Sequence, residues 1–105
     1  MPKIERVPHA GVVLRPSDVF FHWSLSFQDP DDLVRNLDAD VFMIPDLHDA
    51  AGINEWIKQH FTKLFILFLS EWTNKQTHWP DVKDYEVFCQ FFDIEVMPMV
   101  WRVNV

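Results

Sequence analysis

Three residues of this chain have side chains that could do chemistry together. Asp46 and His48 lie two apart after one apolar run, and Glu71 follows a second run. Ligand sites of α/β proteins lie outside the carboxyl ends of strands, which is where both segments are expected. A carboxylate, an imidazole and a second carboxylate could hold zinc or transfer a proton. We favour a simpler interpretation, in which Asp46 and Asp49 form a turn and a helix cap, because no metal-site spacing such as H-E-x-x-H is present.

The remaining reactive residues give no further site. Cys89 is the only cysteine, and we expect it to lie as a small apolar side chain on the inner face of a helix. Asp29, Asp31 and Asp32 imitate the start of a calcium loop, but Val34 occupies the position that requires glycine. The sequence therefore predicts no catalytic residue, no bound metal and no cofactor.

Aromatic residues are a second kind of candidate. Trp72, Trp79, Trp101 and Phe20 fall in expected loops or on strand faces that the core does not fully account for. Trp is enriched at the hot spots of protein interfaces, although a small aromatic-rich domain also buries such residues. The candidate binding residues are Asp46, His48, Glu71, Trp72, Trp79 and Pro98.

Composition limits the classes of partner. The 105 residues are 49% hydrophobic and carry a net charge of −7, which predicts one folded, soluble domain over residues 1–105. The few basic residues are scattered, so the chain would repel nucleic acid. The longest apolar run, Leu64–Leu69, is far shorter than the about 20 residues of a membrane span. We expect a cytoplasmic protein whose partner is another, basic protein, and a homo-oligomer is compatible with this.

Hydrophobic periodicity predicts the elements of the first half. Residues 1–10 are expected to form an irregular arm, followed by a short strand at Val12–Leu14. Alternation of apolar and polar residues predicts a strand over 19–27. Asp29 starts a short helix, and the apolar run Val41–Ile44 predicts a strand that is buried on both faces.

The segment Leu64–Leu69 has two readings. Asp49 caps a helix whose apolar stripe could continue through this segment without a glycine or proline. However, Ile66 and Leu67 would then lie on the polar side, so we favour a central parallel strand. Periodicity alone leaves both readings open.

The last third completes the predicted fold. Residues 70–80 connect to a third helix that Asp81 caps, and Val96–Val105 forms a final strand that Pro98 interrupts. The fold class is α/β, with a mixed sheet of about four to five strands, parallel pairs among them, flanked by three helices.

From about Phe20 to Val105, this order of elements resembles the thioredoxin-like superfamily. The segment Val96–Val100 is the most specific part, and the resemblance implies a cis proline at Pro98. The two redox cysteines of that family fall at positions 47–50, where this chain has Leu-His-Asp-Ala. The resemblance therefore implies a shortened, redox-inactive member that acts as an adaptor, chaperone or binding module.

Two hypotheses about function follow. The first is a non-catalytic, acidic protein-binding module, which includes an adaptor, a chaperone-like protein or an inhibitor of the immunity type. The alternative is a small metal-dependent or acid–base enzyme that uses Asp46, His48 and Glu71.

Overall fold

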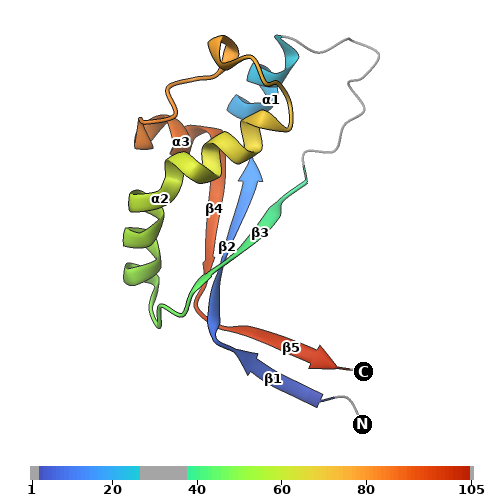
Figure 1. The fold of residues 1–105 in the computed structure, drawn as a ribbon, viewed down its shortest axis with the longest axis vertical. Helices are drawn as coiled ribbons and strands as arrows, with labels where there is room; N and C mark the ends of the chain where they lie inside the picture. The colour runs from blue at the N-terminus through green and yellow to red at the C-terminus, as the bar shows by residue number, and fades with distance from the viewer. Residues whose placement is uncertain (1–2, 27–37, 105) are drawn as a thin grey trace.

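The computed structural model describes residues 3–26 and 38–104, and this part of the chain contains three α-helices and five strands in two sheets (Figure 1). In chain order the elements are β1 (Lys3–Val7), β2 (His9–Pro16), α1 (Asp18–Leu25), β3 (Asp40–Pro45), α2 (Ala50–Ser70), the 3₁₀ turn η2 (Gln76–His78), α3 (Tyr85–Phe91), β4 (Phe92–Met97) and β5 (Val100–Asn104). The predicted α/β class with three helices is confirmed at this level.

The main sheet has β2 at its centre, in the order β3-β2-β4. Both neighbours run antiparallel to β2, with Leu14 opposite Asp40 on one side and Ile94 on the other. The expected parallel pairs are absent from the described strands. α2 and α3 do connect two strands of the same direction, β3 and β4, but β2 lies between these strands and separates them. The predicted single sheet with parallel pairs is therefore wrong.

The core lies between this sheet and the helices. Alternate residues of β2, namely Ala10, Val12 and Leu14, are each 0% exposed. Phe20 of α1 is also 0% exposed and lies within a group of rings. Its ring centroid is 5.3–6.2 Å from those of Trp23, Phe68, Trp72, Phe91 and Phe92. These separations are typical of stabilising aromatic pairs, so the aromatic residues of this chain build the core that joins all three helices to the sheet.

β1 continues into β2 and β4 continues into β5, so the two pairs form one long ribbon with a break. Val7 faces Val100 before the break and Gly11 faces Met97 after it, so three residues of the first strand stand opposite two of the second. An extra residue of this kind bends a ribbon. The β1–β5 pair, called the arm below (residues 3–7 and 100–104), accordingly leaves the body at an angle (Figure 1).

Each of the two strands has a proline at this break. Pro8 separates β1 from β2, and Pro98 separates β4 from β5. Neither residue has the backbone N–H that a ladder requires, so regular pairing stops here on both strands. The predicted interruption at Pro98 is confirmed. The irregular arm predicted for residues 1–10 is wrong over Lys3–Val7, which forms a regular strand.

Leu64–Leu69 continues α2, so the strand that we favoured for this segment is wrong. Four of its six side chains enter the core, while Ile66 and Leu67 are 36% and 48% exposed. Ending the helix before Leu64 would break its backbone hydrogen bonds. Exposing two aliphatic side chains costs less free energy than that. Even with this extension, no helix in the described ranges is long and apolar enough to cross a membrane.

The strand predicted over 19–27 is also wrong, because Asp18–Leu25 forms α1. Its buried residues Phe20 and Ser24 lie four apart, on one face of the helix, whereas Val19 is 44% exposed. The alternation of apolar and polar residues therefore does not mark a strand here, because the buried residues follow the spacing of a helix. The helix predicted from Asp29 lies outside the described residues.

The strand predicted at Val41–Ile44 is confirmed within β3, but it is not buried on both faces. It is an edge strand, and Val41 and Met43 are 65% and 57% exposed. The predicted strand at Val12–Leu14 is confirmed within β2.

The third helix begins one turn later than predicted. Its cap is Asp84 and not Asp81, since the Asp84 side chain accepts hydrogen bonds from the N–H groups of Glu86 and Val87. Cys89 lies on the exposed side of this helix, so its predicted burial is wrong.

The structure does not confirm the thioredoxin-like arrangement. The resemblance implies a strand at 64–69 and a cis bond before Pro98, whereas the segment is helical and no described peptide bond is cis.

We predict that two leucines of α2, two residues apart, differ strongly in their response to truncation. Leu69→Ala should lower the free energy of unfolding by about 2–5 kcal/mol, because Leu69 is fully buried. Leu67→Ala, the same chemical change on the exposed side, should change it by about 0.5 kcal/mol or less. Urea unfolding followed by Trp fluorescence measures both values. Equal losses in the two variants would show a segment buried on both sides, and would contradict the helix.

Candidate functional site

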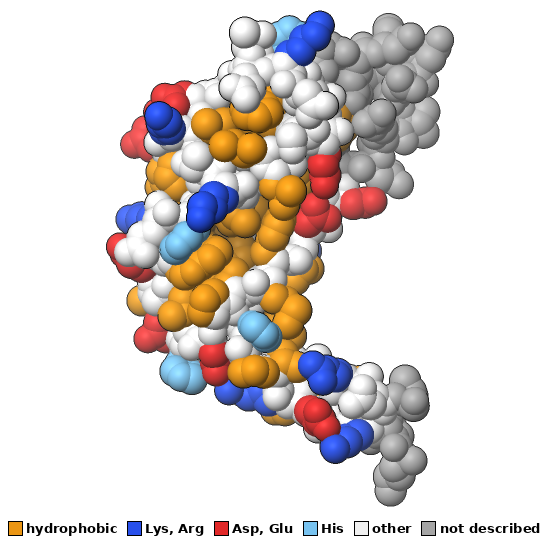
Figure 2. Space-filling view, viewed as in Figure 1, with side chains coloured by type: hydrophobic (Ala, Val, Ile, Leu, Met, Phe, Trp, Pro, Cys, Tyr) orange, Lys and Arg blue, Asp and Glu red, His pale blue; other side chains and the backbone are white. Residues whose placement is uncertain are grey.

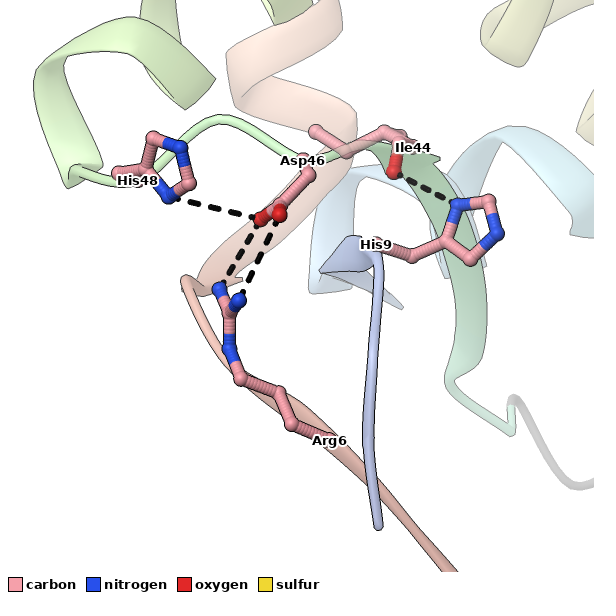
Figure 3. Close-up of polar contacts among 5 residues, drawn as sticks. All are labelled: Arg6, His9, Ile44, Asp46 and His48. Atoms are coloured by element: carbon pink, nitrogen blue, oxygen red, sulfur yellow. Dashed lines mark hydrogen bonds and ion pairs between the residues drawn. The ribbon is translucent and has the colours of Figure 1, made fainter.

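Asp46 binds an arginine of the arm (Figure 3). Its two carboxylate oxygens lie 3.0 and 3.5 Å from the guanidinium nitrogens of Arg6. His48 is a more distant neighbour, with Nδ1 3.7 Å from Asp46 Oδ1 and a side chain that is 79% exposed. Among the ion pairs of the described residues, the Arg6–Asp46 pair alone joins the arm to the body. The carboxylate therefore already has a structural partner.

The neighbouring residues of this loop are structural as well. Asp49 caps α2 as predicted, and its Oδ1 accepts a hydrogen bond of 2.6 Å from the N–H of Gly52. His9, at the start of β2, has Nδ1 3.3 Å from the carbonyl oxygen of Ile44 (Figure 3). The loop thus fixes the beginning of α2 and the end of β3.

Glu71 does not join Asp46 and His48. It caps the carboxyl end of α2, whereas the loop with Asp46 precedes the amino end of that helix. A helix of 21 residues is about 30 Å long, so the three side chains cannot act on one ligand. No cluster of three His, Cys, Asp or Glu side chains suited to a metal occurs within residues 3–26 and 38–104. The expected proximity rested on a strand at 64–69 and is lost with it.

The predicted tryptophans mostly brace the core. Trp72 and Trp79 are half-buried, and the Trp79 indole N–H donates a hydrogen bond of 3.0 Å to the carbonyl oxygen of Thr73. Trp23 of α1 likewise donates to the carbonyl of His78, at 2.8 Å. Trp101, in contrast, is 54% exposed on the arm. Pro98 is half-buried at the base of the arm.

A surface that the sequence analysis missed lies on the face of the main sheet opposite the core. Met43 and Met97 flank Gly11 across the three strands, and Val41 lies in the next row. Their side chains are 57%, 39% and 65% exposed, respectively. We call Val41, Met43 and Met97 the methionine face. The signal was present in β4, where alternation places Met97 on the same face as the exposed Asp93 and Glu95.

Gly11 shapes the centre of this face. A Cβ atom at this position would lie 3.3 Å from the Cβ of Met97 and 3.5 Å from a methyl group of Val100. The first distance is tighter than ordinary carbon contacts, so the missing side chain lets Met97 and Val100 approach the central strand. Met97 and Val100 therefore pack directly over the glycine at the centre of the methionine face.

The charged end of the same face is mainly acidic. Asp93 and Glu95 of β4 lie beyond Met97, and Arg15 of β2 forms an ion pair with Glu95. The charged end thus carries two carboxylates and one guanidinium, and the face changes from apolar to acidic along β4.

Hydrophobic side chains also reach the surface on the side that carries α2. Figure 2 shows them in a band between α2 and β3, and shows a recess where the arm leaves the body. Ile66 and Leu67 are among the exposed hydrophobic residues of α2. This second surface is the natural control for any test of the methionine face.

Among the described residues, Tyr85 at the start of α3 has a pKa that departs clearly from its ordinary value. Burial, followed by a hydrogen bond and a charge interaction with Cys89, raises its pKa from 10.0 to about 12. The Lys58 ammonium lies 5.7 Å from the centre of the same ring. Burial and Cys89 favour the neutral phenol, and the contact with Lys58 links α2 to α3.

Comparison with known proteins adds no relative. No protein-family model matches the chain, and searches of curated proteins and of solved structures found no match.

We predict that Tyr85 titrates near pH 12, which its phenolate absorbance reports cleanly because the chain has one tyrosine. Since the folded-state pKa is raised, this group stabilises the fold below pH 10, and its contribution is lost as pH rises towards 12. Tyr85→Phe should abolish that part of the pH dependence. Cys89→Ala should lower the pKa only in part, because burial is the larger cause. A titration midpoint at the ordinary value of 10.0 would contradict the observed packing.

Proposed function

We propose that this chain is a non-catalytic, acidic protein-binding module whose methionine face contacts the partner. The observation that supports it best is the exposure of Val41, Met43 and Met97 on one sheet face, on the two strands that flank β2. Contiguous exposed apolar residues of this kind mark interaction sites more often than isolated ones do.

The side chains of this face suit a binding role. Methionine is unbranched and polarisable, so it adapts to irregular surfaces, and it is enriched in protein interfaces. Complete burial of a fully exposed side chain of this kind contributes about 1.5–3 kcal/mol, and each of these three partly exposed side chains can add a fraction of that to the affinity.

Charge favours a basic partner. The chain carries −7 overall, and Asp93 and Glu95 extend the methionine face with carboxylates. An acidic field accelerates encounter with a basic protein and orients it, so that basic side chains meet β4 while apolar ones meet the methionines. An adaptor fits this description, as does an inhibitor or immunity-type protein that covers the basic surface of its target.

The enzymatic alternative has less support. It needs Asp46, His48 and Glu71 in one place, and the length of α2 separates Glu71 from the other two. Asp46 is moreover occupied by Arg6.

We expect Met43→Lys to abolish capture of the specific partner while the variant remains folded, because it places a cation in the apolar face and opposes a basic surface. The matched control is Leu67→Lys, which adds the same charge at an exposed site on α2. Affinity capture from the source cells, quantified by mass spectrometry, compares both variants with the wild type. A partner that the wild type and Leu67→Lys capture equally, and Met43→Lys loses, supports the proposal. Loss with Leu67→Lys alone would move the site to α2 and contradict it.

A further inference from the structure

The outer edge of β1 has no strand beside it among the described residues. β3 covers the corresponding edge of β2 only as far as Pro45, which faces His9, and the chain then turns away towards α2. β1 therefore pairs with β5 alone. Two short strands are marginally stable by themselves, and an uncovered edge offers its backbone N–H and C=O groups to another strand.

One face of the arm is apolar and exposed. Ile4 pairs with Val103, and these side chains are 63% and 56% exposed. Trp101, two residues along β5 on the same face, is 54% exposed and lies opposite Arg6. The arm thus lacks both a third strand and a cover for its apolar face, and a partner that extends the sheet would widen this face into a continuous row.

The opposite face of β1 has charges that complement themselves. Lys3 and Glu5 lie on either side of Ile4, two residues apart, and their side chains form a contact of 2.8 Å on this face. A twofold axis through an antiparallel strand pair places one residue opposite its own copy and inverts the order of its neighbours. With the axis at Ile4, each Lys3 therefore stands opposite the Glu5 of the other copy, twice in one dimer.

Other registers of β1 lack this complementarity. An axis at Lys3, Glu5 or Arg6 sets two like charges directly opposite each other, which is destabilising. The outer edge of β5 carries Arg102 as its single charge, so no register of β5 with itself joins opposite charges. The self-complementary edge is β1, centred on Ile4.

We propose that the chain forms a homodimer in which β1 pairs antiparallel with β1 of a second copy about Ile4. The result is a four-stranded sheet in the order β5-β1-β1-β5, with an apolar row of Val103, Ile4, Ile4 and Val103 across it. Residues 3–5 of the two copies lie opposite one another, an overlap of about 10 Å within β1, and the bodies lie at opposite ends of it. The methionine face remains free, so this inference goes beyond the proposed function and does not depend on it.

The test reverses one charge at a time. Lys3→Glu places Glu opposite Glu in both pairs, and Glu5→Lys places Lys opposite Lys. Each variant alone should dimerise about tenfold more weakly than the wild type or worse, because two cross-strand pairs change from attraction to repulsion. Mixed in equal amounts, the two variants should form a heterodimer with wild-type affinity, since every cross-copy pair again joins Glu with Lys. Analytical ultracentrifugation over a concentration series measures all of these.

The mixture distinguishes loss of the contacts between chains from a defect in the folding of each variant. In both variants the contact between positions 3 and 5 within one chain is lost, so only contacts between chains can restore assembly. Lys63→Glu, at an exposed site on α2, is the matched control and should dimerise as the wild type does. A wild type that stays monomeric, a Lys3→Glu variant that dimerises normally, or a mixture no tighter than its components would each overturn the proposal. None of these results affects capture by the methionine face, so the two proposals fail separately.

Discussion

The break in the long ribbon at Pro8 and Pro98 determines the architecture of this chain. One extra residue on the first strand and a proline on each strand end regular pairing at the same level. On one side of the break the ribbon is the centre and edge of a sheet that helices cover. On the other side it continues as an arm of two paired strands (Figure 1). The two surfaces that we propose for binding follow from this division.

The body is stable because β2 is buried on its core face and paired on both sides. The zero exposure of Val12 and its neighbours on that face reflects the cover provided by α2 and the rings around Phe20. The arm has no equivalent. Besides the continuous strands, the Arg6–Asp46 pair holds it to the body, and pairs of this exposure contribute about 1 kcal/mol or less. Stability is therefore distributed unevenly, with a rigid body and a weakly held arm.

From the sequence, the caps and interruptions of helices and strands could be predicted better than the type of the periodic segments. The Asp49 cap and the interruption at Pro98 each follow from local chemistry, and both are correct. Leu64–Leu69 and residues 19–27 were misassigned because an all-apolar or alternating run fits a strand and a buried helix alike. Only packing against β2, which depends on residues far away in sequence, decides between them.

The candidate site could be predicted only where it is local in sequence. Asp46 and His48 are neighbours, but Glu71 lies at the far end of α2, because the segment before it is helical. The methionine face required knowledge of which strands lie at edges, and local sequence does not contain that information.

We infer that the arm and the body are separate units of stability, joined at the proline break. Amide hydrogen exchange measured by NMR at low protein concentration tests it most directly. The account predicts that amides of β2 which pair with β3 or β4 exchange only through global unfolding. Amides that pair β1 with β5 should exchange through local opening, at a much lower free energy. Exchange of β1 and β5 amides as slow as that of β2 would show one cooperative unit and contradict the account.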